Sequence, residues 1–230
     1  MAPSGTRRSY RSAQREARAR ATRLRVLRAA TSLFDERRYA GTTIRSVAER
    51  AGVSVPTVEA LFGTKGRLLK AAIDVAIAGD DEPVPMLARD WAVTAARAAD
   101  PESFLSILAG VLAPAQSRSS GLVLSVLEGA GSDPELAALA AQMAAQRVTM
   151  AAWVVTRLDA LGALRAEAGE DEAADTVFAM MEPTVFDRLT RQRGWTLARY
   201  QDWIARSLLR LLVADVGHGQ RPSPERTDAM

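Results

Sequence analysis

The sequence predicts an all-α protein with an N-terminal three-helix helix-turn-helix domain followed by a helical C-terminal domain. Apolar residues recur at three- and four-residue spacing along most of the 230 residues, which is the helical period. No segment shows the sustained alternation of β-branched and polar residues that marks a strand. Charge divides along the chain as well: residues 1–70 carry 16 Lys and Arg against 5 Asp and Glu, a balance of +11, and the rest is acidic.

The helix-turn-helix is predicted between Thr42 and Lys65. Thr42 or Thr43 can cap a first short helix, and Gly52 ends it at a position where a left-handed backbone favours glycine. Ser54 can cap the second short helix, with Pro56 in its first turn, where a missing N–H is tolerated. This spacing is typical of a DNA-binding pair whose second helix enters the major groove.

Longer helices flank this pair. Upstream, one apolar face ends near Gly41, and downstream Thr64 can cap a fourth helix with Lys65 in its first turn. The segment Leu27–Leu69, LRAATSLFDERRYAGTTIRSVAERAGVSVPTVEALFGTKGRLL, resembles the N-terminal domain of the TetR family of transcriptional regulators. The family favours tyrosine where this chain has Glu59 and glycine where it has Arg38.

The resemblance implies a homodimer that binds double-stranded operator DNA and responds to a small-molecule effector, with no cofactor. Lys65 and Thr43 would meet phosphates, while Val55, Pro56, Thr57 and Ala60 would approach bases. Glu59 would repel phosphate unless it reads a cytosine amino group or pairs with a basic side chain. The predicted DNA-binding residues are Thr42, Thr43, Arg45, Ser54, Val55, Pro56, Thr57, Glu59, Ala60 and Lys65.

Four regions follow from composition and charge. We expect a flexible basic arm at residues 1–20, the DNA-binding domain at 21–78, a ligand-binding and dimerisation domain at 79–215, and a disordered tail at 216–230. The arm is interpreted either as a phosphate or minor-groove contact or as an extension without defined contacts. No long uncharged apolar run and no hydrophobic leader are present, and cysteine is absent, so we expect a cytoplasmic protein without a membrane partner.

The C-terminal helices are predicted at about 86–98, 102–116, 120–129, 134–162, 171–193 and 196–214, with Pro183 bending the fifth. The last two have wide apolar faces, and the final segment resembles the dimerisation helix of TetR-family proteins. A central place within one chain would explain the same pattern. The predicted dimer residues are Met181, Val185, Leu189, Tyr200, Ile204, Leu208 and Leu211.

An apolar effector site is predicted between residues 86–116 and 134–181, where large side chains alternate with alanine. Plain core packing is the alternative for each residue. The predicted ligand-binding residues are Trp91, Phe104, Met143, Gln146, Arg147, Met150, Trp153 and Phe178.

Evidence for catalysis is weak, and we expect no enzyme and no metal site. His218 is the single histidine and falls in the predicted tail. The acidic clusters Asp80–Glu82 and Glu170–Glu172 fall in a linker and at a helix start, where carboxylates are favourable. The sequence therefore predicts a ligand-responsive repressor acting on a palindromic operator. The alternative is a TetR-like helical enzyme or scaffold without sequence-specific DNA binding.

Overall fold

The computed structural model describes residues 5–165 and 169–214, with side chains described from residue 14 onward. These residues form helices, and the described part of the chain contains no sheet beyond one isolated bridge between Leu164 and Val213, so the predicted all-α class is confirmed. The predicted tail and His218 lie outside the described residues. The N-terminal region, for which DNA binding is predicted, comprises α1 (Gly5–Gly41), α2 (Ile44–Ala51), α3 (Val55–Phe62) and α4 (Lys65–Ala78).

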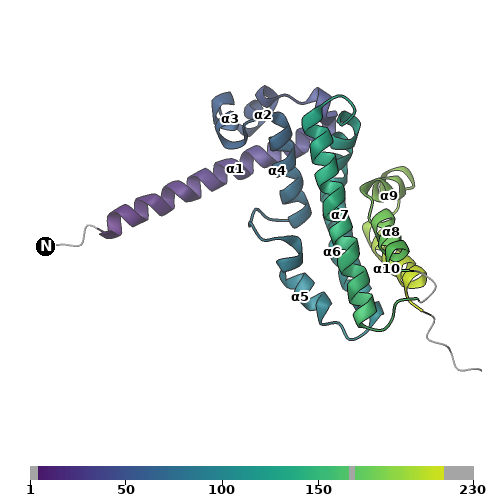
Figure 1. The fold of residues 1–230 in the computed structure, drawn as a ribbon. Helices are drawn as coiled ribbons and strands as arrows, with labels where there is room; N and C mark the ends of the chain where they lie inside the picture. Colours follow the sequence, from purple (N-terminus) through teal and green to yellow (C-terminus); the bar gives the residue numbers. More distant parts are fainter. Residues whose placement is uncertain (1–4, 166–168, 215–230) are drawn as a thin grey trace, which may run out of the picture.

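The C-terminal region begins with a short 3₁₀ turn, η1 (Met86–Ala88). It continues with α5 (Asp90–Ala96), α6 (Pro101–Gly129), α7 (Pro134–Ala160), α8 (Glu170–Met180), α9 (Pro183–Asp187), the π-helical turn η2 (Arg188–Gln192) and α10 (Leu197–Leu212). The helices α6 and α7 form the long axis of this region, with α5 on one side and α8, α9 and α10 on the other (Figure 1). Within the described residues, no helix is long and apolar enough to cross a membrane.

Local sequence signals determine the helix-turn-helix as predicted. Thr43 caps α2 by accepting a hydrogen bond from the Ser46 backbone N–H, and the Ser46 hydroxyl accepts one from the Thr43 N–H in return. Gly52 ends α2 with φ 64°, a left-handed angle that glycine adopts without strain. Ser54 then caps α3 through the Thr57 N–H. These two caps and the glycine define the turn.

The predicted arm is helical from residue 5 onward, because α1 already begins at Gly5. Arginine and alanine are good helix formers, and the first half of the helix stands clear of the other helices (Figure 1). Near its other end, Arg38 has φ 58° and ψ −177°, a conformation that is rare for any residue except glycine. This explains why glycine is favoured at that position in the family that the sequence resembles.

Two helix predictions in the C-terminal region need correction. The segments 102–116 and 120–129 form the single helix α6, which continues through Pro114. Within this helix the Ser119 hydroxyl is buried and donates to the Ala115 carbonyl, at 2.8 Å, so its polar group is satisfied. The predicted helix 171–193 is instead interrupted at Pro183, where α8 ends and α9 begins.

Two hydrophobic cores are present, and the first crosses the expected domain boundary. It joins α1–α4 with the end of α6 and the start of α7, through Val126, Leu136 and Met143. The second core holds α5, the first half of α6, the later part of α7, and α8–α10. The DNA-binding helices are thus completed by side chains of the C-terminal region.

Candidate nucleic-acid interface

The outer side of α3 presents a small, weakly polar surface. Ser54, Pro56, Glu59 and Ala60 are exposed, and Thr57 is half-buried with its hydroxyl 2.8 Å from that of Ser54. The opposite side of the helix is anchored in the core by Val58 and Phe62. Val55 packs partly against the same core, so it offers less surface than predicted. The exposed residues suit contact with base edges because small apolar groups fit against thymine methyls.

The start of α2 adds Thr43 and Arg45, both exposed. The prediction that Thr42 contacts DNA is wrong. Thr42 is fully buried, and its hydroxyl donates hydrogen bonds to the carbonyls of Leu33 at 3.1 Å and Arg38 at 2.8 Å. Thr42 therefore closes the end of α1, and Thr43 alone caps α2.

Lys65, at the start of α4, is half-buried against Tyr39. Its Nζ lies 3.8 Å from the centroid of the Tyr39 ring and donates a hydrogen bond of 3.0 Å to the Tyr39 carbonyl. Burial lowers the pKa of the Lys65 ammonium and raises the pKa of the Tyr39 hydroxyl to about 12. Lys65 is the first residue of α4, and its ammonium is held against the Tyr39 ring and carbonyl.

Glu59 is exposed on α3, and within the described residues it forms no ion pair. The carboxylate is thus free to accept a hydrogen bond from outside the chain. Glu36 on α1 is paired, unlike Glu59. Arg50 makes a bidentate contact with it, at 2.7 and 3.0 Å, and this contact holds the pKa of Glu36 down to about 2. The Glu36 pair fastens α2 to α1.

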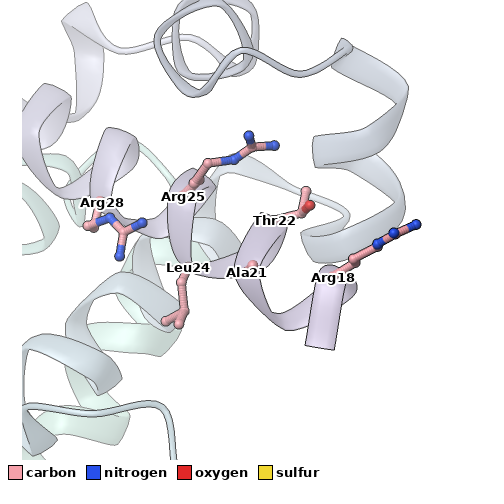
Figure 2. Close-up of a pocket in the computed structure, with 6 residues that line it drawn as sticks. All are labelled: Arg18, Ala21, Thr22, Leu24, Arg25 and Arg28. Carbon is pink, nitrogen blue, oxygen red and sulfur yellow. The ribbon is translucent and has the colours of Figure 1, made fainter. Parts of the chain in front are cut away.

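A second basic surface lies on α1. Exposed Arg18, Arg25 and Arg28 line a shallow hollow of about 610 Å³, together with Ala21, Thr22 and Leu24 (Figure 2). On another side of the helix, Arg20 pairs with Asp81, with Nε 3.0 Å from one carboxylate oxygen. The acidic cluster Asp80–Glu82 therefore serves as an ion-pair partner, with Arg89 bonding Asp80 at 2.7 Å.

The predicted effector residues do not gather around one cavity. Trp153 packs against Trp91 and Phe104 with ring centroids 5.8 and 5.4 Å apart, and Phe104 is fully buried. Met143 belongs to the other core, with α1–α4, and Gln146 is exposed, so neither lies with these rings.

Arg147 comes from α7 and links it to α8 and α9. Its guanidinium lies 4.8 Å from the centroid of the Phe178 ring and 2.6 Å from the Glu182 carboxylate. Met150 is half-buried at the edge of the same core. Trp91, Phe104, Arg147, Met150, Trp153 and Phe178 thus remain in the predicted region, where they pack as core. A hollow of about 530 Å³ lies elsewhere, between the start of α6 and α10.

Most predicted dimer residues lie inside the chain. Tyr200, Ile204 and Leu208 are fully buried against α6, and Met181 is buried too, so their assignment to a dimer surface is wrong. The Tyr200 hydroxyl donates to Gln116 Oε1 at 2.7 Å, and Gln116 Nε2 donates to the Met181 carbonyl at 2.8 Å. The wide apolar face of α10 therefore reflects a central place in the fold. Among the predicted dimer residues, Leu211 is exposed, and Val185 and Leu189 are half-buried.

Contacts of α1 and α4 with the C-terminal region were missed by sequence reasoning. The Thr64 hydroxyl donates to Glu135 Oε1 at 2.6 Å, and the Tyr39 hydroxyl lies 3.2 Å from Asp133 Oδ2. At the other end of α4, Arg118 of α6 donates to the Ala76 carbonyl at 2.7 Å. No short-range pattern marks these pairs, because their members are 42 to 94 residues apart.

Comparison with known proteins agrees with this architecture. Residues 26–72 match the family described as bacterial regulatory proteins, tetR family. Sequence comparison with curated proteins gives no match. Among solved structures, the regulator FadR of Bacillus subtilis in complex with stearoyl-CoA has a TM-score of 0.64 at 16% identity, covering 81% of this chain and 97% of that one.

Two further structures are similar. The SmeT–triclosan complex has a TM-score of 0.65 at 18% identity, covering 89% of this chain and 98% of that one. NalD of Pseudomonas aeruginosa, the secondary repressor of the MexAB-OprM multidrug efflux pump, has a TM-score of 0.61 at 18% identity, covering 86% and 99%. These structures share the fold of this chain, a helix-turn-helix head followed by a helical C-terminal region. The family match covers residues 26–72, which hold the end of α1, α2, α3 and the first half of α4.

Proposed function

We propose that the protein is a ligand-responsive repressor that occupies a palindromic operator as a homodimer and releases it when a small apolar effector binds. The observation that carries this proposal is the exposed edge of α3, Ser54 to Ala60, within a region of charge +11 over residues 1–70. A basic domain that presents an open helix is suited to the major groove. Its place of action would be the cytoplasm.

The DNA contacts divide into two kinds. Thr43, Arg45 and Lys65 would bind phosphates. Thr43 and Lys65 lie at helix N-termini, and Arg45 and Lys65 are cationic. Pro56 and Ala60 would meet thymine methyls, and Ser54 and Thr57 supply hydroxyls. Glu59 would accept a hydrogen bond from a cytosine amino group, which turns its exposed carboxylate into a base contact.

A gel shift with DNA upstream of the gene tests this proposal. Ala60→Asp adds a second carboxylate to the outer side of α3, so we expect binding to be lost. Ala96→Asp changes an equally exposed alanine on α5 and should bind as the unmodified protein does. Equal binding by both variants, each folded, would contradict the proposed interface.

A homodimer is supported by the outer face of α7. Between Glu135 and Arg157 the only charged residue of this helix is Arg147, which turns to Glu182. One row of exposed positions, at alternating three- and four-residue spacing, carries small or apolar side chains, and Val148 in this row is 57% exposed. Such an uncharged stripe suits close packing against the same helix of a second copy. Its members are Ala138, Ala141, Ala145, Val148 and Ala152.

The effector is proposed to enter between α5, α6 and α7, among Trp91, Phe104 and Trp153. The Trp91 indole N–H is buried without a hydrogen-bond partner in the described residues, although a buried donor normally has one. An apolar effector with one acceptor group would satisfy it. Because these rings now pack together, binding requires them to separate, and the helices that carry them would shift.

Such a shift would reach DNA through α4. Both ends of α4 are held by the C-terminal region, at Thr64 by Glu135 of α7 and at the Ala76 carbonyl by Arg118 of α6. An effector that binds more tightly when α6 and α7 are displaced would therefore lower operator affinity. The size of the effect is set by the difference between its affinities for the displaced and undisplaced arrangements.

The second candidate is a TetR-like enzyme or scaffold that does not read DNA. Exposed Glu59 favours it, because a carboxylate on α3 repels phosphate. The same gel shift separates the two. Glu59→Gln should strengthen non-specific binding in either case, and only a DNA-reading protein should lose preference at one base pair of its operator.

A further inference from the structure

Three elements from distant parts of the chain meet at Gly121, in the middle of α6. Asp35 comes from α1 and Arg191 from η2, and Arg191 Nη2 lies 2.9 Å from Asp35 Oδ1. A Cβ on Gly121 would collide with that carboxylate oxygen and would lie 3.0 Å from the same arginine nitrogen. The absence of a side chain at Gly121 therefore lets the ion pair lie directly against the α6 backbone.

This meeting point falls where α6 passes from one hydrophobic core to the other. Up to Ala113 the buried apolar residues of α6 pack in the second core, and from Leu122 onward they pack in the first. The segment between them buries small or polar residues and belongs to neither core. Because little apolar area joins the two cores at this level, polar contacts across α6 have a larger share in fixing how they lie.

The ion pair joins the two cores through side chains alone. On one side, Arg191 Nε lies 3.3 Å from Asp187 of α9, and Leu189 packs against the second core. On the other side, Asp35 follows Phe34, which is fully buried in the first core. The Arg191 and Asp35 side chains are 42% and 48% exposed, and a pair this exposed stabilises only weakly. A small movement is therefore enough to open it.

Other contacts hold α1 to α6 without reaching η2. Arg38 donates to the Gly121 carbonyl at 3.2 Å, and the Ser125 hydroxyl donates to the Phe34 carbonyl at 3.3 Å. The Arg191 contact adds a connection from η2, which is a π-helical turn, a wider helical form that is frequent at functional sites. The end of α1 is thus fastened to α6 and, by a weaker contact, to the elements that follow α8.

We propose that the Asp35–Arg191 ion pair is a regulatory contact, which holds α1 in one orientation relative to α9 and η2 and opens when those two elements move. The helix-turn-helix would follow α1, because Arg50 of α2 is paired with Glu36, the residue next to Asp35. The inference rests on the proposed function in that the moving head binds DNA. It adds a route through α1 to the route through α4.

The test follows amide hydrogen exchange in the full-length protein, without DNA or effector. Asp35→Asn and Arg191→Gln remove the ion pair, and amides of residues 27–51 that exchange by local opening should exchange about two- to fivefold faster. Arg193→Gln removes an exposed arginine just after η2 and should exchange as the unmodified protein does. Gly121→Ala places a methyl group where the carboxylate lies. It should speed exchange in the same residues, although alanine favours a helix more than glycine does.

A second measurement separates regulation from simple stabilisation. Phe186→Leu loosens α9, because the Phe186 ring packs against Tyr200 with centroids 4.8 Å apart. We expect it to speed local exchange in residues 27–51, and to add nothing further when it is combined with Asp35→Asn. Leu158→Val changes a fully buried residue of the same core at the end of α7, and it should leave residues 27–51 unaffected.

Equal exchange in residues 27–51 for Arg191→Gln and Arg193→Gln would overturn the inference. Additive effects of Phe186→Leu and Asp35→Asn would overturn it too, since α9 would then act on the head by another path. No DNA enters these measurements, so they stand apart from the proposed function. A protein that bound no duplex would refute operator recognition, while exchange would still decide whether α9 and η2 control α1.

Discussion

The hydroxyl of Thr64 donates a hydrogen bond of 2.6 Å to the carboxylate of Glu135, and this contact joins the start of α4 to the start of α7. Gly66 makes the approach possible, because a Cβ there would lie 2.4 Å from a Glu135 oxygen. Thr64 also caps α4 through the Arg67 N–H. The same hydroxyl therefore caps α4 and anchors its start to the C-terminal region.

This contact should appear as a coupling energy between the two residues. In a double-mutant cycle of Thr64→Val and Glu135→Ala, we expect the free energies of unfolding to be non-additive by about 0.5–1.5 kcal/mol. Chemical denaturation measures all four proteins. A cycle of Thr64→Val with Glu102→Ala, an exposed acid at the start of α6, should be additive. Additivity in both cycles would show that the bond does not join the two regions in solution.

The dimer is expected to form through α7 and not through α10. Val148→Glu places charge at the centre of the uncharged stripe and should give a monomer by sedimentation, whereas Leu211→Glu should leave a dimer. The two apolar side chains make a matched pair, since they are 57% and 49% exposed. A dimer for Val148→Glu and a monomer for Leu211→Glu would instead place the interface on α10.

Arg38 is expected to reduce stability through its backbone. Its conformation costs about 1–3 kcal/mol for a residue with a side chain, and glycine recovers most of this despite its greater freedom when unfolded. Arg38→Gly and Arg38→Ala both remove the 3.2 Å bond to the Gly121 carbonyl. Arg38→Gly should therefore unfold at higher denaturant than Arg38→Ala. Its free energy of unfolding should be greater by about 1 kcal/mol. Equal stability of the two would argue against strain at this position.

Acid should weaken the fastening of α2 to α1. The Arg50 hydrogen bond lowers the pKa of Glu36 from 4.5 to about 2 in the folded chain. The pair therefore contributes stability above the unfolded pKa, and this contribution is lost as pH falls from about 4.5 through about 2. Glu36→Gln should flatten the pH dependence of the unfolding midpoint in that window. Glu49→Gln, an exposed change on α2, should not. Parallel curves for Glu36→Gln and the unmodified protein would rule out this contribution.

The sequence predicted the helix-turn-helix closely because its signals are local. Thr43, Gly52 and Ser54 each act within four residues, through caps or a left-handed backbone angle. The resemblance to the family also marked Arg38 as unusual, and the structure gives the reason in its positive φ. The roles of the exposed α3 residues on DNA stay predictions.

The errors arise where partners are distant in the chain. Apolar residues of α10 such as Ile204 and Leu208 look alike whether they face a second copy or α6, so periodicity could not separate an interface from a core. Thr42 and Thr43 are equally good caps by type, and only the bonds of Thr42 to Leu33 and Arg38 decide between them. The Lys65–Tyr39 contact likewise depends on how α4 crosses α1.

Selection of duplexes from a random library by the full-length protein tests the central claim most directly. We expect enrichment of a two-fold symmetric site, with half-sites about 34–36 Å apart or at a multiple of that spacing. By anisotropy, the enriched duplex should bind about a thousandfold or more tightly than a scrambled one, and its affinity should fall steeply with salt. No enrichment, or equal and salt-independent binding to both duplexes, would contradict the assignment as an operator-binding regulator.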